Sequence, residues 1–309
     1  MRVQQLILSE IYKHSEVKEI DNGALWCRGE DVTKIQFSNS AIHTEIGRCS
    51  VVTIETLFGP RFKAPNAYTL ARINRRSCYG SYFVVDQRLV LKASYSLYEN
   101  DPATNWVISA LLQCFGDQLA FGVANVHSIV DPSALAAHRA NLEYPRSWQS
   151  EVNLASAVTT ADRLTERGWL SSVDGESLFA EVSLDDGPRS RMIDINAETA
   201  LVRVSSGVRH PIAGVGFAST IAIPIDPERA EIPIWAKRLN DAEHELIDFV
   251  PRLGAWGERS LGSHLVYSMF WPTTEYSDAL LGNLANWMIQ RCLWVKETYW
   301  KSNVGLLSA

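Results

Sequence analysis

The segment from residue 70 to residue 95, "LARINRRSCYGSYFVVDQRLVLKASY", decides the fold of the first half of the chain. It begins with a short basic helix and passes at once into two β-rich runs. Only Asp86 and Gln87 separate these runs, and a two-residue connection predicts a tight hairpin. In the second run one face is predicted to be much more apolar than the other, because two sets of residues alternate: Leu89, Leu91, Ala93, Tyr95 and Leu97 with Val90, Lys92, Ser94 and Ser96. A helix that leads into such a hairpin predicts the edge of a sheet with a helical cover.

The elements around this segment predict an α+β domain. Apolar residues at helical spacing predict a first helix at 2–14, and "PNAYTLARINRR" predicts a middle helix at 65–76. The strands expected between these helices are 34–38, 41–46 and 50–58. A final helix at 101–121, with Asp101 as its cap and Pro102 in its first turn, closes the unit. The predicted order is α-β-β-β-α-β-β-α, with an antiparallel sheet covered by helices.

The second half of the chain repeats this order in outline. The helices expected there are 159–170, 233–249 and 277–295, and the last strand is 263–271. "ARIN" (71–74) returns as "KRLN" (237–240), and "YSLY" (95–98) returns as "YSMF" (267–270). Because the echoes keep their order, we predict two tandem domains, 1–125 and 159–309, joined by a connecting helix and linker at 126–158. A chain of 309 residues is long enough for two domains with separate cores.

Charge and composition exclude several classes of function. Residues 1–150 carry 15 Lys and Arg against 14 Asp and Glu, and residues 151–309 carry 14 against 21. The acidic second half argues against a nucleic-acid partner, which requires a basic surface. We find no apolar run near the roughly 20 residues that span a bilayer, and no signal-peptide cleavage site. We therefore expect a cytoplasmic protein with no nucleic-acid or membrane partner.

The motifs that suggest chemistry fail on inspection. "GERSLGSH" (257–264) has phosphate-loop spacing, but Ser263 replaces the lysine, so it predicts a turn. "GESLF" (175–179) lacks the second glycine of a nucleophile elbow. The seven histidines show no metal-ligand spacing, and five dispersed cysteines predict reduced, packed thiols. We therefore expect no catalytic, cofactor-binding or metal-binding residues, and no cofactor.

The first half resembles the YbjN-like domain, which belongs with the type III secretion chaperone-like folds (the "TY-Chap" group). Ile73-Asn74, the hairpin at 81–97 and the helix from Asp101 carry this resemblance. The second half resembles a more divergent copy through Leu239-Asn240 and 263–271, and it departs from the pattern in the longer segment 241–262. The resemblance implies a peptide-binding chaperone, in some relatives linked to secretion, without catalytic residues. Because such chaperones are typically dimers, it implies either a homodimer or a monomer that acts as a fused pseudo-dimer.

We therefore predict a non-enzymatic protein that binds an extended or unfolded segment of a client protein. The candidate contact residues are Phe83, Val85, Leu91 and Tyr95 on the hairpin, and Arg72 and Arg76 on the preceding helix. Core packing is the alternative for the hairpin residues, and a solvated face is the alternative for the arginines, which otherwise suit an acidic partner segment. The competing functions are an enzyme or small-ligand-binding protein with a dispersed site, and a structural subunit of a complex.

Overall fold

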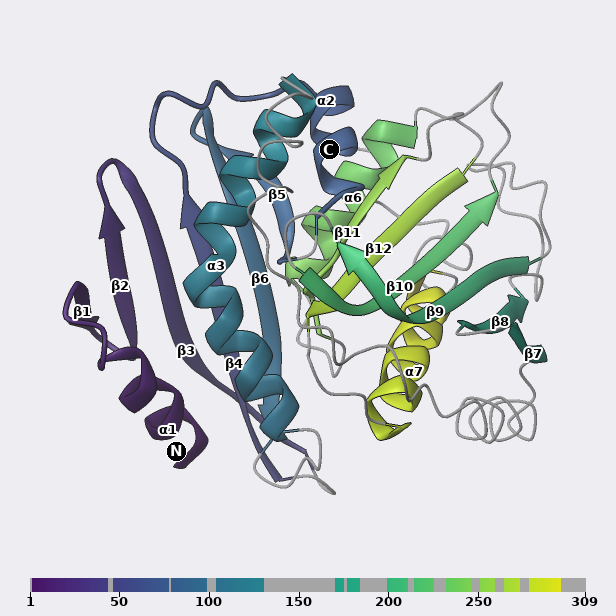
Figure 1. Ribbon diagram of the computed structural model, residues 1–309, viewed down its shortest axis with the longest axis horizontal. Coiled ribbons are helices and arrows are strands. Elements are labelled where there is room, and N and C mark those ends of the chain that lie inside the picture. Colours follow the sequence, from purple (N-terminus) through teal and green to yellow (C-terminus); the bar gives the residue numbers. More distant parts are fainter. Residues whose placement is uncertain are drawn as a thin grey trace.

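The fold is α+β, with two antiparallel six-stranded sheets beside each other (Figure 1). The computed structural model describes residues 2–43, 47–77, 79–98, 104–130, 170–174, 177–183, 199–210, 214–224, 232–245, 251–258, 264–272 and 278–295. The first sheet contains β1 (Val17–Ile20), β2 (Gly23–Arg28), β3 (Asp31–His43), β4 (Gly47–Leu57), β5 (Ser81–Val85) and β6 (Arg88–Tyr98). The second contains β7 (Leu170–Asp174), β8 (Ser177–Ser183), β9 (Thr199–His210), β10 (Gly214–Pro224), β11 (Ala255–Glu258) and β12 (His264–Pro272). The described helices are α1 (Arg2–Ile11), α2 (Ala67–Asn74), α3 (Thr104–Val130), α6 (Ile232–Glu245) and α7 (Asp278–Val295).

The two sheets have the same strand order. It is β1-β2-β3-β4-β6-β5 in the first sheet and β7-β8-β9-β10-β12-β11 in the second. In each half four strands precede the middle helix, α2 or α6, so the prediction of three strands was wrong. The segments predicted as strands 34–38 and 41–46 belong mainly to one strand, β3, whose alternation is broken by an irregularity between Asn39 and Ile42. Strand β1 was not predicted, because its sequence "VKEI" has charged residues at its centre and lies at the exposed edge of the sheet.

Tight turns join β1 to β2, β2 to β3 and β5 to β6, the last of which is the predicted hairpin. Asp86 and Gln87 have φ angles of 49° and 61°, the left-handed geometry of a two-residue hairpin turn. Asn22 adopts the same region (φ 53°) between β1 and β2, and Gly29 (φ 68°) does so between β2 and β3. The turn signals Asn22-Gly23 and Gly29 could therefore have revealed β2 in the sequence.

The described helices lie where the sequence predicted them, but their lengths differ from the predicted ones. The side chain of Asn66 caps α2 by accepting a hydrogen bond from the Thr69 amide (2.9 Å). The final helix of the first half, α3, extends to Val130, beyond the predicted end at 121. Asp101 and Pro102, predicted to begin it, lie outside the described residues, as do the connecting segment from 131 to 158 and nearly all of the helix expected at 159–170.

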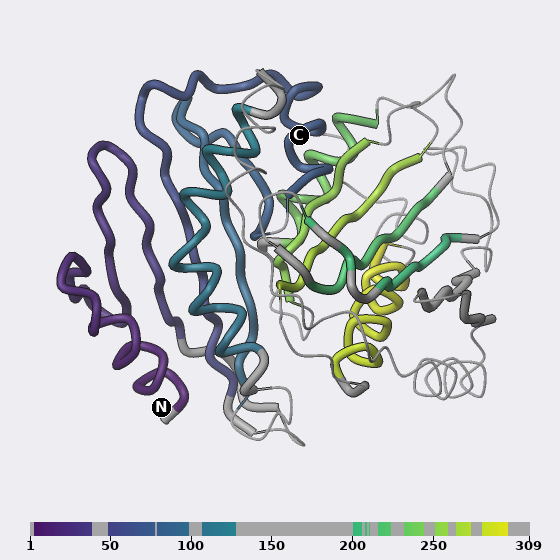
Figure 2. The backbone as a smooth tube through the Cα atoms, in the orientation of Figure 1, coloured from purple at the N-terminus to yellow at the C-terminus, as the bar shows by residue number. Residues whose placement is uncertain are grey.

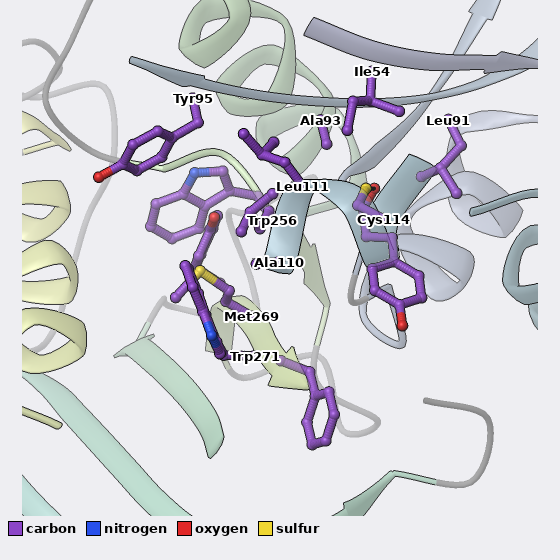
Figure 3. Packing of buried hydrophobic residues seen from close by; sticks show 14 of the residues in the cluster. Ile54, Leu91, Ala93, Tyr95, Ala110, Leu111, Cys114, Trp256, Met269 and Trp271 are labelled. Atoms are coloured by element: carbon purple, nitrogen blue, oxygen red, sulfur yellow. Dashed lines mark hydrogen bonds between the residues drawn. The ribbon is translucent and has the colours of Figure 1, made fainter. Parts of the chain in front are cut away.

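The buried apolar side chains of the two halves form one continuous core, in contrast to the two separate cores expected. Figure 3 shows Tyr95 and Leu111 of the first half in one cluster with Trp256, Met269 and Trp271 of the second. The Trp287 ring, on α7, contacts Tyr95 (ring centroids 6.1 Å apart) and Trp271 (5.6 Å). The two halves therefore depend on each other for burial of their largest side chains.

Helix α3 lies within this core. Val107, Leu111, Cys114 and Phe121 are all buried, and the Phe121 ring lies 5.7 Å from that of His210 in the second half. The segment Val107–His127 is long and apolar enough to cross a membrane by length and composition, contrary to the expectation that no such run exists. However, 56% of its apolar window is buried inside the protein, as is usual for the central helix of a globular core.

The halves meet along α2 and α6, shown in blue and light green in the upper middle of the tube view (Figure 2). The amide of Gly80, just before β5, donates to the carbonyl oxygen of Leu253, just before β11 (3.0 Å). Gly257 on β11 lies against α2, where a Cβ atom would be 2.8 Å from the Ala71 carbonyl oxygen and from the Arg75 nitrogen. Only glycine fits this position without moving the α2 backbone.

Replacing Gly257 by alanine therefore tests the junction. We expect Gly257→Ala to lower the free energy of unfolding by about 1–3 kcal/mol, because the new methyl group overlaps backbone atoms that cannot rotate away. Gly116→Ala is the matched control, since nothing lies within 4 Å of its added Cβ on α3. That change should raise stability by up to about 1 kcal/mol through helix propensity. Urea unfolding of both variants measures the difference, and equal effects would contradict the close approach.

Candidate functional site

The face of the first sheet opposite α3 carries a row of apolar side chains that crosses five strands. Gln118 of α3 contacts the Thr56 hydroxyl (2.7 Å), which identifies the covered face, and the neighbours of Thr56 along β4 point to the other side. On this second face, the strand register places five side chains next to one another on neighbouring strands. We call them the apolar row: Cys27, Val32, Leu57, Val90 and Phe83. Cys27 is exposed, Val90 is buried and the other three are partly exposed.

A row of charged side chains lies beside the apolar row. Lys34 pairs in register with Glu55, and Glu55 with Lys92, so that positive, negative and positive groups alternate across β3, β4 and β6. All three are partly exposed. Opposite charges on neighbouring strands stabilise a sheet modestly, by about 0.2–1 kcal/mol for each pair. This face therefore combines apolar area with fixed charges, which suits contact with another polypeptide.

The structure divides the four predicted hairpin residues between the two faces of the sheet. Phe83 and Val85 lie on the face of the apolar row, Phe83 partly exposed and Val85 51% exposed. Leu91 (0% exposed) and Tyr95 (3%) lie on the face covered by α3 and belong to the core. Their prediction as contact residues is therefore corrected to the alternative of core packing, because β5 and β6 pair Phe83 with Val90 and not with Leu91.

Both predicted arginines, Arg72 and Arg76, are exposed at the C-terminal part of α2, together with Arg75. The helix ends at Asn74, so Arg75 is its C-terminal cap residue and Arg76 follows it. The three arginines therefore lie at or just beyond the C-terminal end of α2. Their exposure is compatible with both interpretations made from the sequence, a solvated face and a contact with an acidic segment.

One buried asparagine side chain binds the edge strand of each sheet that faces the other half of the chain, which we call the inner edge. The amide of Tyr82 on β5 donates to Asn74 Oδ1 (2.6 Å), and Asn74 Nδ2 donates to the Tyr82 carbonyl oxygen (3.2 Å). The amide of Trp256 on β11 donates to Asn240 Oδ1 (2.8 Å), and Asn240 Nδ2 donates to the Trp256 carbonyl oxygen (3.0 Å). Each asparagine is 1% exposed, and each amide group pairs with the strand as a neighbouring strand would.

The equivalent bonds give the register between the two halves. The "ARIN" and "KRLN" echo is matched in space, because Asn74 and Asn240 make the same pair of bonds. The "YSLY" and "YSMF" echo is out of register by four residues. Trp256 pairs with Tyr267, whereas Tyr82 pairs with Leu91, so Tyr267 corresponds to Leu91 and not to Tyr95.

The second half of the chain occupies a further part of the inner edge of the first sheet. Strand β6 is longer than β5, and beyond their last pair Ser94 is bridged by Arg252. Arg252 N–H donates to the Ser94 carbonyl oxygen (2.8 Å), and Ser94 N–H donates to that of Arg252 (3.3 Å). At Tyr82 and at Ser94 this edge is therefore already paired, and an added strand has no free backbone groups to bind there.

A buried ion pair at the centre of the second half is the described group closest to a catalytic arrangement. Glu243 Oε1 accepts from Arg291 Nε (2.5 Å) and from Trp256 Nε1 (3.0 Å), and Arg291 Nη2 donates to the Pro251 carbonyl oxygen (3.0 Å). The Arg291 guanidinium also lies 3.8 Å from the centre of the Tyr267 ring. Burial opposes the charge on Arg291, yet the adjacent Glu243 carboxylate leaves its pKa raised. The pair is closed among α6, α7, β11 and β12, as expected of a structural bond.

The described cysteines and acidic groups were compared with the requirements of a metal site and of a reactive thiol. No group of three or more His, Cys, Asp or Glu side chains within the described ranges is arranged to hold a metal ion. Burial raises the pKa of the Cys292 thiol to about 12 and that of Cys114 still further above its usual value, so both are protonated at neutral pH. Cys78 lies outside the described residues, and exposed Cys27 ends the apolar row.

Comparison of the chain with protein-family models, with curated proteins and with solved structures gives no match. The face of the first sheet and its apolar row are therefore the basis of the functional interpretation.

The asparagine amides yield a direct stability prediction. Asn74→Ala and Asn240→Ala should each lower the free energy of unfolding by about 1–3 kcal/mol or more, because each leaves a buried N–H and C=O of the sheet edge without a partner. Gln36→Ala removes an exposed amide from β3 and serves as the control, with an expected change within about 0.5 kcal/mol. Chemical denaturation measures all three. Asparagine variants as stable as the control would show that the edges do not need these amides.

Proposed function

We propose that the protein is a non-enzymatic, chaperone-like protein of the YbjN-like type that binds an extended or unfolded segment of a client protein. The observation that supports this most strongly is the apolar row, which joins five strands on the face of the first sheet opposite α3. A polypeptide lying along this row would bury apolar side chains against Val32, Leu57 and Phe83. Complete burial of a large apolar side chain contributes about 1.5–3 kcal/mol.

The closed inner edge directs the proposed contact to the face of the sheet. Because Asn74 and Arg252 already pair with the backbone of β5 and β6, strand addition at this edge would require breaking existing hydrogen bonds. Side-chain contacts on the face need no such rearrangement. The alternating charges of Lys34, Glu55 and Lys92 would then select client segments by charge.

We also propose that the chain arose by tandem duplication and that its two copies form a pseudo-dimer within one chain. The shared strand order, the paired asparagine bonds and the contact between α2 and α6 support it. In this arrangement one chain supplies both partners of a dimer, so a single chain is the functional unit. Light scattering that shows an obligate dimer joined through α2 and α6 would contradict this part of the proposal.

Suppression of client aggregation tests the proposed function. Reduced insulin, whose B chain aggregates, serves as the unfolded client, and light scattering follows its aggregation with and without the protein. We expect suppression by the unchanged protein and loss of at least about half of it in Val85→Asp, which places a charge beside the apolar row. Leu6→Asp is the matched control, since Leu6 and Val85 are both 51% exposed and Leu6 lies on α1.

Two outcomes would overturn the proposal. In one, the unchanged protein fails to suppress aggregation and a small molecule raises its unfolding temperature strongly, which favours a ligand-binding protein or enzyme. In the other, Val85→Asp and Leu6→Asp reduce suppression equally, which shows that the face of the sheet is not involved.

A further inference from the structure

The helix pair α2 and α6 carries a second surface, whose residues differ from those of the apolar row. Five large apolar side chains are markedly exposed among the described residues, and two of them, Tyr68 (63%) and Ile234 (36%), lie on these two packed helices. Exposed apolar side chains on a junction between two halves have no role in the core. Tyrosine in particular is enriched in surfaces that bind other proteins.

The two helices present the same pair of side chains at equivalent positions. With Asn74 and Asn240 as the reference, Tyr68 corresponds to Ile234, since both lie six residues earlier, and Arg72 corresponds to Arg238, two residues earlier. Within each helix the apolar residue and the arginine are four residues apart and share one face. An apolar side chain followed four residues later by an arginine is therefore present at equivalent positions of α2 and α6.

Positive charge predominates on the described side chains of this pair. Arg72, Arg75 and Arg76 at α2 are exposed and Arg238 on α6 is half-exposed, whereas the charge of exposed Lys237 is matched by that of Asp241. The acidic side chains described on α6 have partners within the protein: Asp241 bonds to Lys237 (2.6 Å), and Glu243 bonds to buried Arg291. This positive surface belongs to a chain with a net charge of −6, so its sign is opposite to that of the whole molecule.

We propose that the face formed by α2 and α6 binds a protein segment in which Asp or Glu residues alternate with large apolar residues. The inference rests on the proposed function and adds the chemistry of one class of partner. The carboxylates pair with Arg72 and Arg238, and the apolar side chains pack on Tyr68 and Ile234. Charge complementarity selects such a segment and accelerates its association. The aliphatic Ile234 favours a polypeptide over a single-stranded nucleic acid, whose bases stack on aromatic side chains.

Fluorescence anisotropy with defined probes tests this binding. The probe is a labelled 12-residue peptide that repeats Glu-Leu-Glu-Phe, and its controls repeat Lys-Leu-Lys-Phe and Glu-Ser-Glu-Ser. We expect the acidic apolar peptide to bind best, and to bind more weakly as salt concentration rises. The variant Arg72→Glu/Arg238→Glu should weaken its binding about tenfold or more. Lys13→Glu/Lys18→Glu makes the same change in net charge on exposed side chains elsewhere and should leave the affinity unchanged.

A second variant distinguishes loss of binding from loss of folding. Tyr68→Ser changes no charge and alters a side chain that is largely exposed, and it should reduce affinity several-fold. The proposal is overturned if the two double variants bind the peptide equally. It is also overturned if a 12-nucleotide oligo-dT or phosphatidylglycerol vesicles bind more tightly than the peptide and respond to Arg72→Glu/Arg238→Glu. If insulin aggregation is still suppressed in either case, the proposed function stands and only this surface is rejected.

Discussion

The arrangement of the molecule depends on two asparagine amides that take the place of missing strands. Each sheet would otherwise end, at β5 or β11, in unpaired backbone groups buried at the junction of the two halves. A buried N–H or C=O without a partner costs about 1–3 kcal/mol, so these groups need a donor and an acceptor. The Asn74 and Asn240 side chains supply both with bond lengths between 2.6 and 3.2 Å. The two inner edges can therefore approach each other without forming a continuous twelve-stranded sheet.

Closed inner edges also bear on the proposed contact with another chain. Exposed sheet edges invite pairing with any extended polypeptide, and proteins that avoid aggregation cover them. Here the inner edge is covered by the Asn74 amide and by the Arg252 backbone, while the outer edge strand β1 carries exposed Lys18 and Glu19. What stays available on the first sheet is a face, with a row of apolar side chains beside a row of alternating charges. In the proposed function, binding through this face would select a client by its side chains more than by its backbone.

The sequence predicted the local structure better than the contacts between distant segments. The Asp86-Gln87 turn, the middle helices and the last helix of each half follow from short-range patterns, because turns and helices depend on neighbouring residues. An irregularity in β3 and the charged edge strand β1 broke the alternation on which strand prediction relies. The continuous core was beyond prediction, since it depends on how Tyr95 meets Trp287, nearly two hundred positions later in the chain.

For the candidate site too, the sequence predicted local patterns but not the contacts between distant segments. Alternation along the hairpin showed that one face was more apolar, but it could not show which face α3 covers. Residues of both faces, Phe83 and Val85 together with Leu91 and Tyr95, were therefore chosen as contacts. The echo of Asn74 in Asn240 was visible in the sequence, whereas its role at the sheet edge became clear only from the hydrogen bonds. Glu243 and Arg291 gave no signal, because their pairing joins two helices distant in sequence.

Hydrogen exchange at the amides of Tyr82 and Trp256 tests the central claim most directly. If the asparagine side chains close the inner edges, these two amides should exchange only when the whole protein unfolds, with protection equal to that of the core strands. The amide of Glu19 on the outer strand β1, which faces away from β2 in the antiparallel ladder, gives the comparison for an exposed edge. Exchange of Tyr82 and Trp256 as fast as at β1 would contradict the account.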